Sequence, residues 1–196
     1  MREDLREAGT GLALAIAVLL IVAAACRADD AADEIAAIQE QCLVKNNELR
    51  AARSLRPHRL NAALNAAAQD HAQYMARTGS MSHYSNGGPG GRAARHGFGA
   101  GVRENIAYGY QSVRIVFGVW HGSGGHYANM MSATTDAGFG LAYGAGGTPY
   151  WCAVYGTPPR PPEPAEEPEQ TPPANVSPET YSTRPGLLGW IFGRRR

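Results

Sequence analysis

The sequence predicts one layered α/β domain, with three or four helices around a small sheet. Two observations predict this class: apolar stripes with helical spacing, and a late alternating segment split by a glycine-rich turn. The chain has 196 residues, which is enough for one domain of ordinary size with appendages. Its formal net charge of +1 gives no general attraction toward nucleic acid, so we expect no nucleic-acid partner.

Two helices are expected in the first part of the domain. Residues 31–54 place Ile35, Ile38 and Cys42 on one face. A second stripe has Pro57 as its start signal and Gly79 as its stop. It consists of Leu60, Leu64, Ala67, His71 and Met75. Because His71 lies on this apolar stripe, we interpret it first as a hydrogen-bonded histidine of the core.

The rest of the domain is expected to contain a loop, a helix and a hairpin. Residues 80–101 are rich in glycine and form a loop, with a short helical piece around 92–96. In residues 113–120 the apolar side chains recur at helical spacing. Residues 137–156 alternate and are split by a glycine-rich turn, which predicts a β-hairpin.

The N-terminal segment directs the chain out of the cytoplasm. Its apolar core, Leu12 to Ala25, has 14 residues. An export signal uses about 7–15 apolar residues, whereas a membrane-spanning helix needs roughly 20. The acidic residues before this core outnumber the arginines, which is atypical of a signal peptide. Residues 1–26 are therefore expected to be either a cleaved signal peptide or an uncleaved anchor.

The end of this segment, "VAAAC", also resembles a bacterial lipoprotein signal. Cys26 would then carry the lipid and become the mature N-terminus, although Ala23 stands where leucine is usual. With each of these alternatives the protein is exported, and it is secreted, periplasmic or held on the outer side of a membrane.

The two other cysteines, Cys42 and Cys152, would meet an oxidising compartment after export. We therefore expect a disulfide between them, which would close a long loop and constrain the unfolded chain. The alternative is two separately buried thiols.

Composition changes abruptly after Gly156. Residues 157–185 hold ten of the thirteen prolines and five glutamates, which predicts an extended linker without a core. Residues 186–196, "GLLGWIFGRRR", combine apolar side chains with three arginines. This tail suits contact with an anionic membrane or a partner, or is an unstructured end, and it is too short to span a bilayer.

Three polar residues from separate segments are candidates for one site: His83, Glu104 and His126. Two imidazoles and a carboxylate suit zinc or another divalent cation, and a carboxylate can also hold an imidazole in one tautomer. The gaps of 21 and 22 residues match no local metal motif. His58 and His96 are expected to be exposed.

The ordered segments "RPHRLNAALNAAAQDHAQYMA", "MSHYS", "GRAARHG", "ENIAYG", "VWHGSGGHYANMM", "GFGLAYG" and "YWCAVYG" resemble the CAP superfamily. This group includes cysteine-rich secretory proteins, antigen 5 and pathogenesis-related proteins, and the version here is similar to the bacterial branch. The resemblance covers residues 38–156, so we expect a CAP domain over residues 31–156.

The resemblance implies a three-layer α-β-α sandwich with a small central antiparallel sheet and a surface cleft. Many members line the cleft with two histidines and two acidic residues. His83, Glu104 and His126 match three of these positions, and Ser123 stands where the second acid is usual. The expected cleft residues are His83, Tyr84, Glu104, Asn105, Ser123, His126 and Tyr127. Among them, His83 and His126 are the expected cation ligands, with Glu104 as an optional third. Asn129 is expected to line the cleft or to secure the loop backbone.

Two functions follow from the resemblance. The first is an envelope or extracellular binding module for a lipid or another hydrophobic ligand, with a divalent cation at the histidines. The second is a hydrolase, with Glu104 as general base for a metal-bound water, or with Ser82, Ser85 or Ser123 activated by a histidine. No serine lies in a nucleophile-elbow motif, which favours the binding module.

Overall fold

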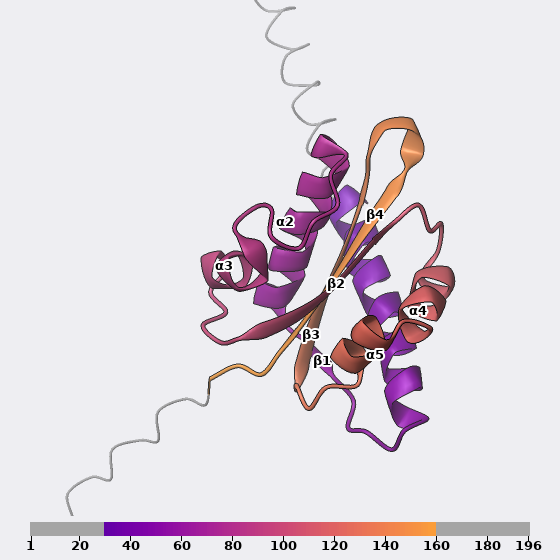
Figure 1. The fold of residues 1–196 in the computed structure, drawn as a ribbon, viewed down its shortest axis with the longest axis vertical. Coiled ribbons are helices and arrows are strands. Elements are labelled where there is room, and N and C mark those ends of the chain that lie inside the picture. The colour runs from indigo at the N-terminus through magenta and orange to yellow at the C-terminus, as the bar shows by residue number, and fades with distance from the viewer. Residues whose placement is uncertain (1–29, 160–196) are drawn as a thin grey trace, which may run out of the picture. The chain divides into compact units, whose positions relative to one another are not determined.

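The computed structural model describes residues 30–159, and Figure 1 shows how their helices and strands are arranged. The first helix covers residues 30–51. It is followed by β1 (Arg59–Leu60), α2 (Ala62–Thr78), α3 (Gly88–Arg95), β2 (Val102–Tyr108), α4 (Val113–His121), α5 (Gly124–Met130), β3 (Asp136–Tyr143) and β4 (Pro149–Gly156). The N-terminal signal or anchor, the tail and all but the first three residues of the linker lie outside the described residues. Within the described part, no helix is both long and apolar enough to cross a membrane.

The four strands form one sheet in the order β1-β3-β4-β2. β4 lies between β3 and β2 and runs antiparallel to both. β1 contributes only two residues, and it pairs with β3 in parallel. The layered fold and the hairpin are therefore confirmed, and the sheet is antiparallel except for β1. Sequence patterning missed β1 because it is so short, and β2 because charged and polar residues interrupt its apolar alternation.

Helix boundaries follow local capping. The first helix ends at residue 51 rather than 54, and the next turn closes at Ser54, whose φ is 55°. α2 begins at Ala62, because the Asn61 side chain accepts hydrogen bonds from the first free backbone N–H groups, while Pro57 precedes β1 instead. Gly79 ends α2 as predicted, with a left-handed φ of 68°.

The two faces of the sheet carry separate cores. α2 and α3 cover one face, and the first helix, α4 and α5 cover the other (Figure 1). Successive residues of β4 alternate between the faces, as a strand requires. One face carries Trp151, Ala153 and Tyr155, and the opposite face carries Tyr150, Cys152 and Val154.

This alternation contradicts the predicted disulfide. Cys42 packs in the core under the first helix, whereas Cys152 packs in the core under α2, on the other side of the sheet. Both are free, buried thiols. Burial raises the pKa of Cys42 to about 12 and that of Cys152 well above its ordinary value, so both stay protonated. The alternative of two separately buried thiols therefore describes the structure.

Two glycines in β3 let α2 lie directly on the sheet. A Cβ atom at Gly138 would stand 2.1 Å from the backbone carbon of Leu64, and one at Gly140 would stand 2.5 Å from that of Ala68. The facing side of α2 is built from alanines, of which Ala67, Ala68 and Ala72 are fully buried. Small residues on both elements thus set the spacing between the layers.

Side-chain amides close the edge of β3 beyond the short strand β1. Asn65 accepts from the backbone N–H of Phe139 at 3.0 Å. Gln69 both donates to the carbonyl of Leu141 at 2.9 Å and accepts from its N–H at 3.0 Å. Gln39 donates to the carbonyl of Phe139 at 3.1 Å. These bonds satisfy backbone groups that a neighbouring strand would otherwise pair.

The prediction for His58 is wrong, whereas that for His96 is confirmed. His58 is only 2% exposed, because the segment after Pro57 turns inward to form β1. Its ring nitrogens pair with Asn46 and with Thr134, each at 3.0 Å. Burial and the nearby charge of Arg50 lower the pKa of His58 to about 4, so the ring is neutral at pH 7. His96 is exposed.

We predict that Gly138→Ala lowers the free energy of unfolding by roughly 3 kcal/mol or more, because its methyl group would collide with the backbone of α2. Chemical denaturation measures this change. Gly118→Ala is the matched control, since Gly118 lies inside α4 with open space at its Cβ position. The control should raise the stability by about 0.5–1 kcal/mol. Equal stability of the Gly138→Ala variant and the wild type would contradict the close approach.

Candidate functional site

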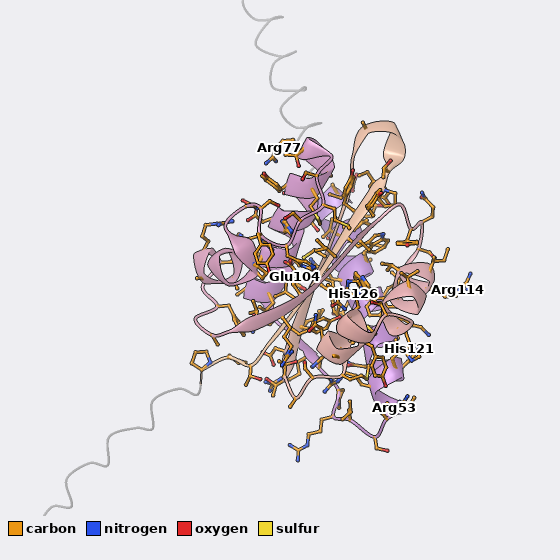
Figure 2. The ribbon with its side chains drawn as sticks, viewed as in Figure 1. Arg53, Arg77, Glu104, Arg114, His121 and His126 are labelled. Carbon is orange, nitrogen blue, oxygen red and sulfur yellow. The ribbon has the colours of Figure 1, made fainter. Side chains whose placement is uncertain are left out.

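Two of the three predicted site residues form a direct hydrogen bond. His83 lies in the loop between α2 and α3, and Glu104 lies in β2. The His83 Nδ1 atom is 2.9 Å from Glu104 Oε1. The side chain of Glu104 is 1% exposed and that of His83 is 42% exposed, so the imidazole connects a buried carboxylate to the surface. His126 comes from α5, on the other side of β2 (Figure 2).

The Glu104 carboxylate is the centre of a buried network. Arg92 of α3 donates from Nη2 to Glu104 Oε2 at 2.5 Å, and the Cys152 thiol lies 3.5 Å from the same oxygen. His71 of α2 brings its Nε2 to 4.0 Å from Oε1. Both carboxylate oxygens are therefore occupied by partners from other elements.

The charge of Glu104 is stabilised by these partners. Burial raises the pKa of the carboxyl group, but the hydrogen bond from His83 and the charge and hydrogen bond of Arg92 lower it further than burial raises it. The net pKa lies below the ordinary value, so Glu104 is ionised at neutral pH. A buried ion pair of this kind is costly to break from one side, because the remaining charge has no partner.

Arg92 is a site residue that the sequence analysis missed. Besides Glu104, it binds the backbone carbonyls of Ser85 and His83, and it thereby holds the loop that carries His83. The sequence predicted only a short helix here, and that helix begins at Gly88 rather than near residue 92. Arg95, in the same helix, forms an exposed ion pair with Asp70, and no local pattern distinguishes the two arginines.

His71 is a core histidine, as predicted, but it lacks the expected hydrogen bonds. Its residue exposure is 0%, and within residues 30–159 neither ring nitrogen lies in good hydrogen-bonding geometry with a partner. Burial lowers the pKa of His71 more than the charge of Glu104 raises it, and the charge of Arg92 lowers it as well. The ring is therefore neutral and stays close to the carboxylate without a short bond.

His126 is held beside β2 through its backbone. Its carbonyl accepts a hydrogen bond from Asn105 at 3.0 Å. Asn129 of the same helix donates to the carbonyl of Glu104 and to the side-chain oxygen of Asn105, each at 2.9 Å. Asn105 and Asn129 thus fasten α5 to β2, which is the structural role left open for Asn129. Burial and the nearby charge of His83 lower the pKa of His126.

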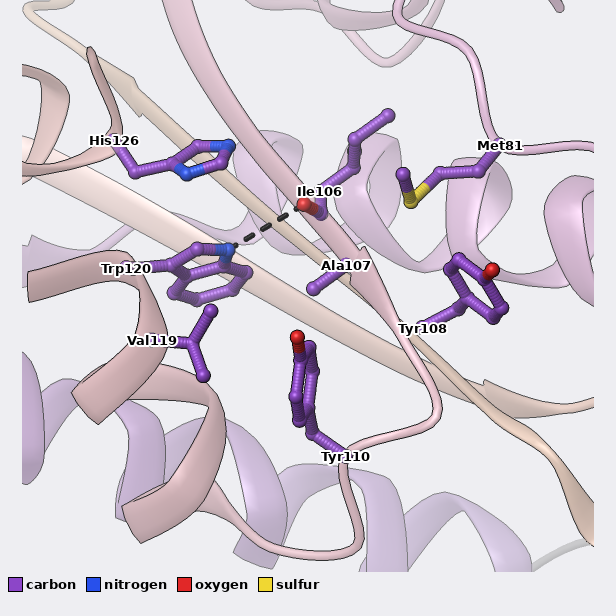
Figure 3. A pocket seen from close by; sticks show the side chains of 8 residues that line it. All are labelled: Met81, Ile106, Ala107, Tyr108, Tyr110, Val119, Trp120 and His126. Atoms are coloured by element: carbon purple, nitrogen blue, oxygen red, sulfur yellow. Dashed lines mark hydrogen bonds between the residues drawn. The ribbon is translucent and has the colours of Figure 1, made fainter. Parts of the chain in front are cut away.

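A small groove lies between β2 and α4, with His126 at one end (Figure 3). Its volume is about 150 Å³. Apolar walls come from Met81, Ile106, Ala107, Val119 and Trp120, and two tyrosines complete the lining. The Trp120 indole N–H donates to the carbonyl of Ile106 at 3.4 Å, which holds the ring against the strand. The groove thus combines an apolar interior with a single imidazole and two phenol hydroxyls.

Tyr84, Asn105, Ser123 and Tyr127, which were also expected in the cleft, do not line this groove. Tyr84 is 87% exposed, whereas Asn105 is fully buried. Ser123 is the N-cap residue of α5. Tyr127 contacts the edge of the His121 ring, with 5.2 Å between their centroids. The sequence analysis missed the apolar wall because its residues come from a loop, a strand and a helix. The apolar residues of each segment, taken alone, are typical of an ordinary hydrophobic core.

If a cation binds at this site, two histidines are the side chains available to hold it. Within residues 30–159, no three His, Cys, Asp or Glu side chains gather in a way that could hold a metal ion. Glu104 has both oxygens engaged, so it acts as the partner that orients His83 rather than as a ligand. This leaves the second ring nitrogen of His83 and the imidazole of His126 as the groups that would hold a cation.

The geometry gives little support to hydrolase chemistry. The Glu104 carboxylate is buried in an ion pair, which suits a structural anion better than a general base. The Ser82 hydroxyl accepts from the backbone N–H of Tyr84, and the Ser85 hydroxyl donates to the carbonyl of Ser82. In the described part of the chain, no hydroxyl group of Ser82, Ser85 or Ser123 is hydrogen-bonded to a histidine ring.

We predict that Glu104→Gln lowers the free energy of unfolding by about 3 kcal/mol at neutral pH, because Arg92 would keep a buried charge without its partner. Since the pKa of Glu104 is depressed below its ordinary value of 4.5, its stabilising charge is present above that pH and is lost as the pH falls below it. The difference in stability between the wild type and the variant should therefore shrink below that pH.

Denaturation at several pH values measures both effects. Glu48→Gln is the control, since Glu48 is exposed and pairs only with Lys45. It should change the stability by less than about 0.5 kcal/mol. A stability difference between wild type and Glu104→Gln that stays constant through the acid range would contradict the assignment.

Comparison with known proteins identifies the family of this chain and agrees with its fold. The profile of the cysteine-rich secretory protein family, CAP, matches residues 43–155. No curated protein sequence matches the chain.

Two solved bacterial structures are similar in fold. An outer surface protein from Borrelia burgdorferi aligns with a TM-score of 0.57 at 18% identity, over 61% of this chain and 92% of that one. An extracellular protein containing an SCP domain, from Bacillus anthracis, aligns with a TM-score of 0.58 at 20% identity, over 63% of this chain and 41% of that one. The family match covers more than half of the sequence, and the α-β-α layers agree with it. The chain belongs to the cysteine-rich secretory protein (CAP) family.

Proposed function

We propose that this protein is an exported binding module that takes a hydrophobic ligand in the groove beside His126. The observation that carries the proposal is the apolar groove between β2 and α4, with its lining of aliphatic, thioether and aromatic side chains. Burial of apolar surface is the main favourable term for a ligand of this kind.

The size of the groove limits what it can enclose. A volume of about 150 Å³ fits one ring or the end of an acyl chain, not a whole lipid. Met81 and Tyr108, at its margin, are 44% and 54% exposed, so they extend an apolar surface beyond the groove. A larger ligand would insert one end and lie with the rest of its body along these side chains.

We propose that His83 and His126 hold a divalent cation weakly. The Glu104 carboxylate faces Nδ1 of His83, which favours a proton there and leaves Nε2 with a lone pair. Two imidazoles are a modest ligand set, and water would complete the shell. When bound, the cation would add a positive charge beside the groove, suited to a polar or anionic end of the ligand.

Export is part of the proposal. It is supported by the short apolar segment that ends before Cys26 and by the printed names of the two structural neighbours, an outer surface protein and an extracellular protein. Lipid attachment at Cys26 and membrane contact through residues 186–196 remain parts of this proposal that depend on the sequence.

We predict that Val119→Asp weakens the binding of a neutral fluorescent sterol or acyl ester at least about tenfold, because the carboxylate would enter the apolar groove. Fluorescence titration of the full chain measures the affinity. Ile115→Asp is the matched control: it lies one turn earlier in α4, is 40% exposed against 38% for Val119, and does not line the groove. Equal affinities in the two variants would reject the groove as the site.

We predict weak, reversible zinc binding that is lost in the His83→Ala/His126→Ala double variant. Calorimetry of the full chain with zinc alone provides the measurement. The control removes two exposed histidines outside the pair, as His96→Ala/His121→Ala, and should keep the affinity of the wild type. If both double variants bind zinc as the wild type does, the cation site is elsewhere.

A further inference from the structure

A second pocket lies at the other end of α5 and shares no lining residue with the groove. Its volume is about 620 Å³, which is within the range of small-molecule sites. One wall comes from the end of the first helix and the segment that follows it, through Arg50, Arg56 and Arg59. The other wall is the loop between α5 and β3, residues 131–135.

The charge of this pocket is one-sided. Three arginines line it, and its lining contains no acidic residue. The nearest carboxylate along the chain is that of Asp136. It already accepts hydrogen bonds from Arg59 at 2.9 Å and from Asn61 at 3.0 Å. Arg59 therefore has a counterion, whereas Arg50 and Arg56 have none among residues 30–159.

Arg50 is the residue that requires an explanation. It is only 2% exposed, and no ion pair in the described part of the chain includes it. Its Nε donates to the carbonyl of Arg56 at 2.8 Å, and its Nη1 donates to the carbonyls of Met130 and Ser132 at 2.7 and 2.9 Å. These bonds hold the guanidinium rigidly between both walls of the pocket.

Carbonyl groups satisfy part of the hydrogen-bonding capacity of Arg50 but do not neutralise its charge. Its second terminal nitrogen, Nη2, has no acceptor among the described residues. A buried cation without a counterion is unfavourable, and an anion within reach would remove this cost. The planar guanidinium is also the side chain best suited to bind a carboxylate or a phosphate.

The hydroxyl groups of the loop serve the structure rather than a ligand. Ser132 donates to the carbonyl of Asn129 at 2.7 Å and pairs with the hydroxyl of Thr134, also at 2.7 Å. Thr134 pairs in turn with the ring of His58. The groups free to meet an anion are therefore Arg50 and the exposed Arg56, while Leu55, Pro57 and Met131 offer apolar contact.

We propose that this pocket binds a small organic anion, with its phosphate or carboxylate group on Arg50 and Arg56 and its apolar body against the pocket wall. This pocket shares no lining residue with the groove, so the proposal for it can be tested separately from the proposed function. We refer to this second pocket, lined by Arg50, Arg56 and Arg59, as the arginine pocket. Its proposed ligand is recognised by negative charge, whereas the proposed ligand of the groove is recognised by an apolar group.

The test titrates the full chain by calorimetry with hexyl phosphate, hexanoate and the neutral analogue hexanol. One or both anions should bind at least about tenfold more tightly than hexanol, and the preferred anion identifies the chemistry of the head group. Arg56→Gln should weaken the anion about tenfold without unfolding the protein, since Arg56 is exposed and its side chain forms no hydrogen bond in the described part of the chain.

Arg103→Gln is the control, because it removes the same charge from an exposed position of β2 outside the pocket. The site is supported if the affinity for the anion is unchanged in Arg103→Gln and reduced in Arg56→Gln. Three results would overturn it: no anion binds, hexanol binds as tightly as the anions, or the two variants reduce the affinity equally. Thermal unfolding of each variant checks that the fold is retained.

Discussion

The buried Glu104 carboxylate is the constraint on which the site depends. It lies in β2, and its partners come from α2, α3, β4 and the loop after α2. Because a buried carboxylate must be paired, each of these elements has to reach one point. The position of His83 at the surface follows, since the same carboxylate and Arg92 together hold its ring and its backbone.

The network lies on the α2 side of β2, whereas the groove runs along the outer edge of this strand and takes lining residues from both faces of the sheet. Glu104 and Ile106 of β2 face the α2 side, while Asn105 and Ala107 face the α4 and α5 side. The asparagine at position 105 fastens α5, and α5 carries His126. Two adjacent residues of β2 therefore set the positions of the two histidines through opposite faces of the sheet. This arrangement allows a polar pair and an apolar groove to lie close together without sharing an interior.

The two pockets differ in the physical basis of recognition. The groove offers apolar walls and the imidazole of His126, whose charge depends on pH. The arginine pocket offers permanent positive charge, fixed by carbonyl groups that hold Arg50 without neutralising it. Both sites adjoin α5, with one near its first turn and the other after its last. A short helix fastened to β2 by asparagines thus borders two surfaces of different chemical character, one apolar and one positively charged.

The sequence by itself determined the layered class, the helix over residues 113–121, the end of α2 at Gly79 and the hairpin, because these depend on local periodicity and turn chemistry. Its ordered motifs also indicated the family and the His83–Glu104 pair. Tertiary structure alone decided that Arg92 is buried while Arg95 is exposed, that His58 turns inward, and that a sheet separates Cys42 from Cys152. Pairing of charges and assignment to one face of a sheet depend on contacts between distant segments, and no local pattern carries that information.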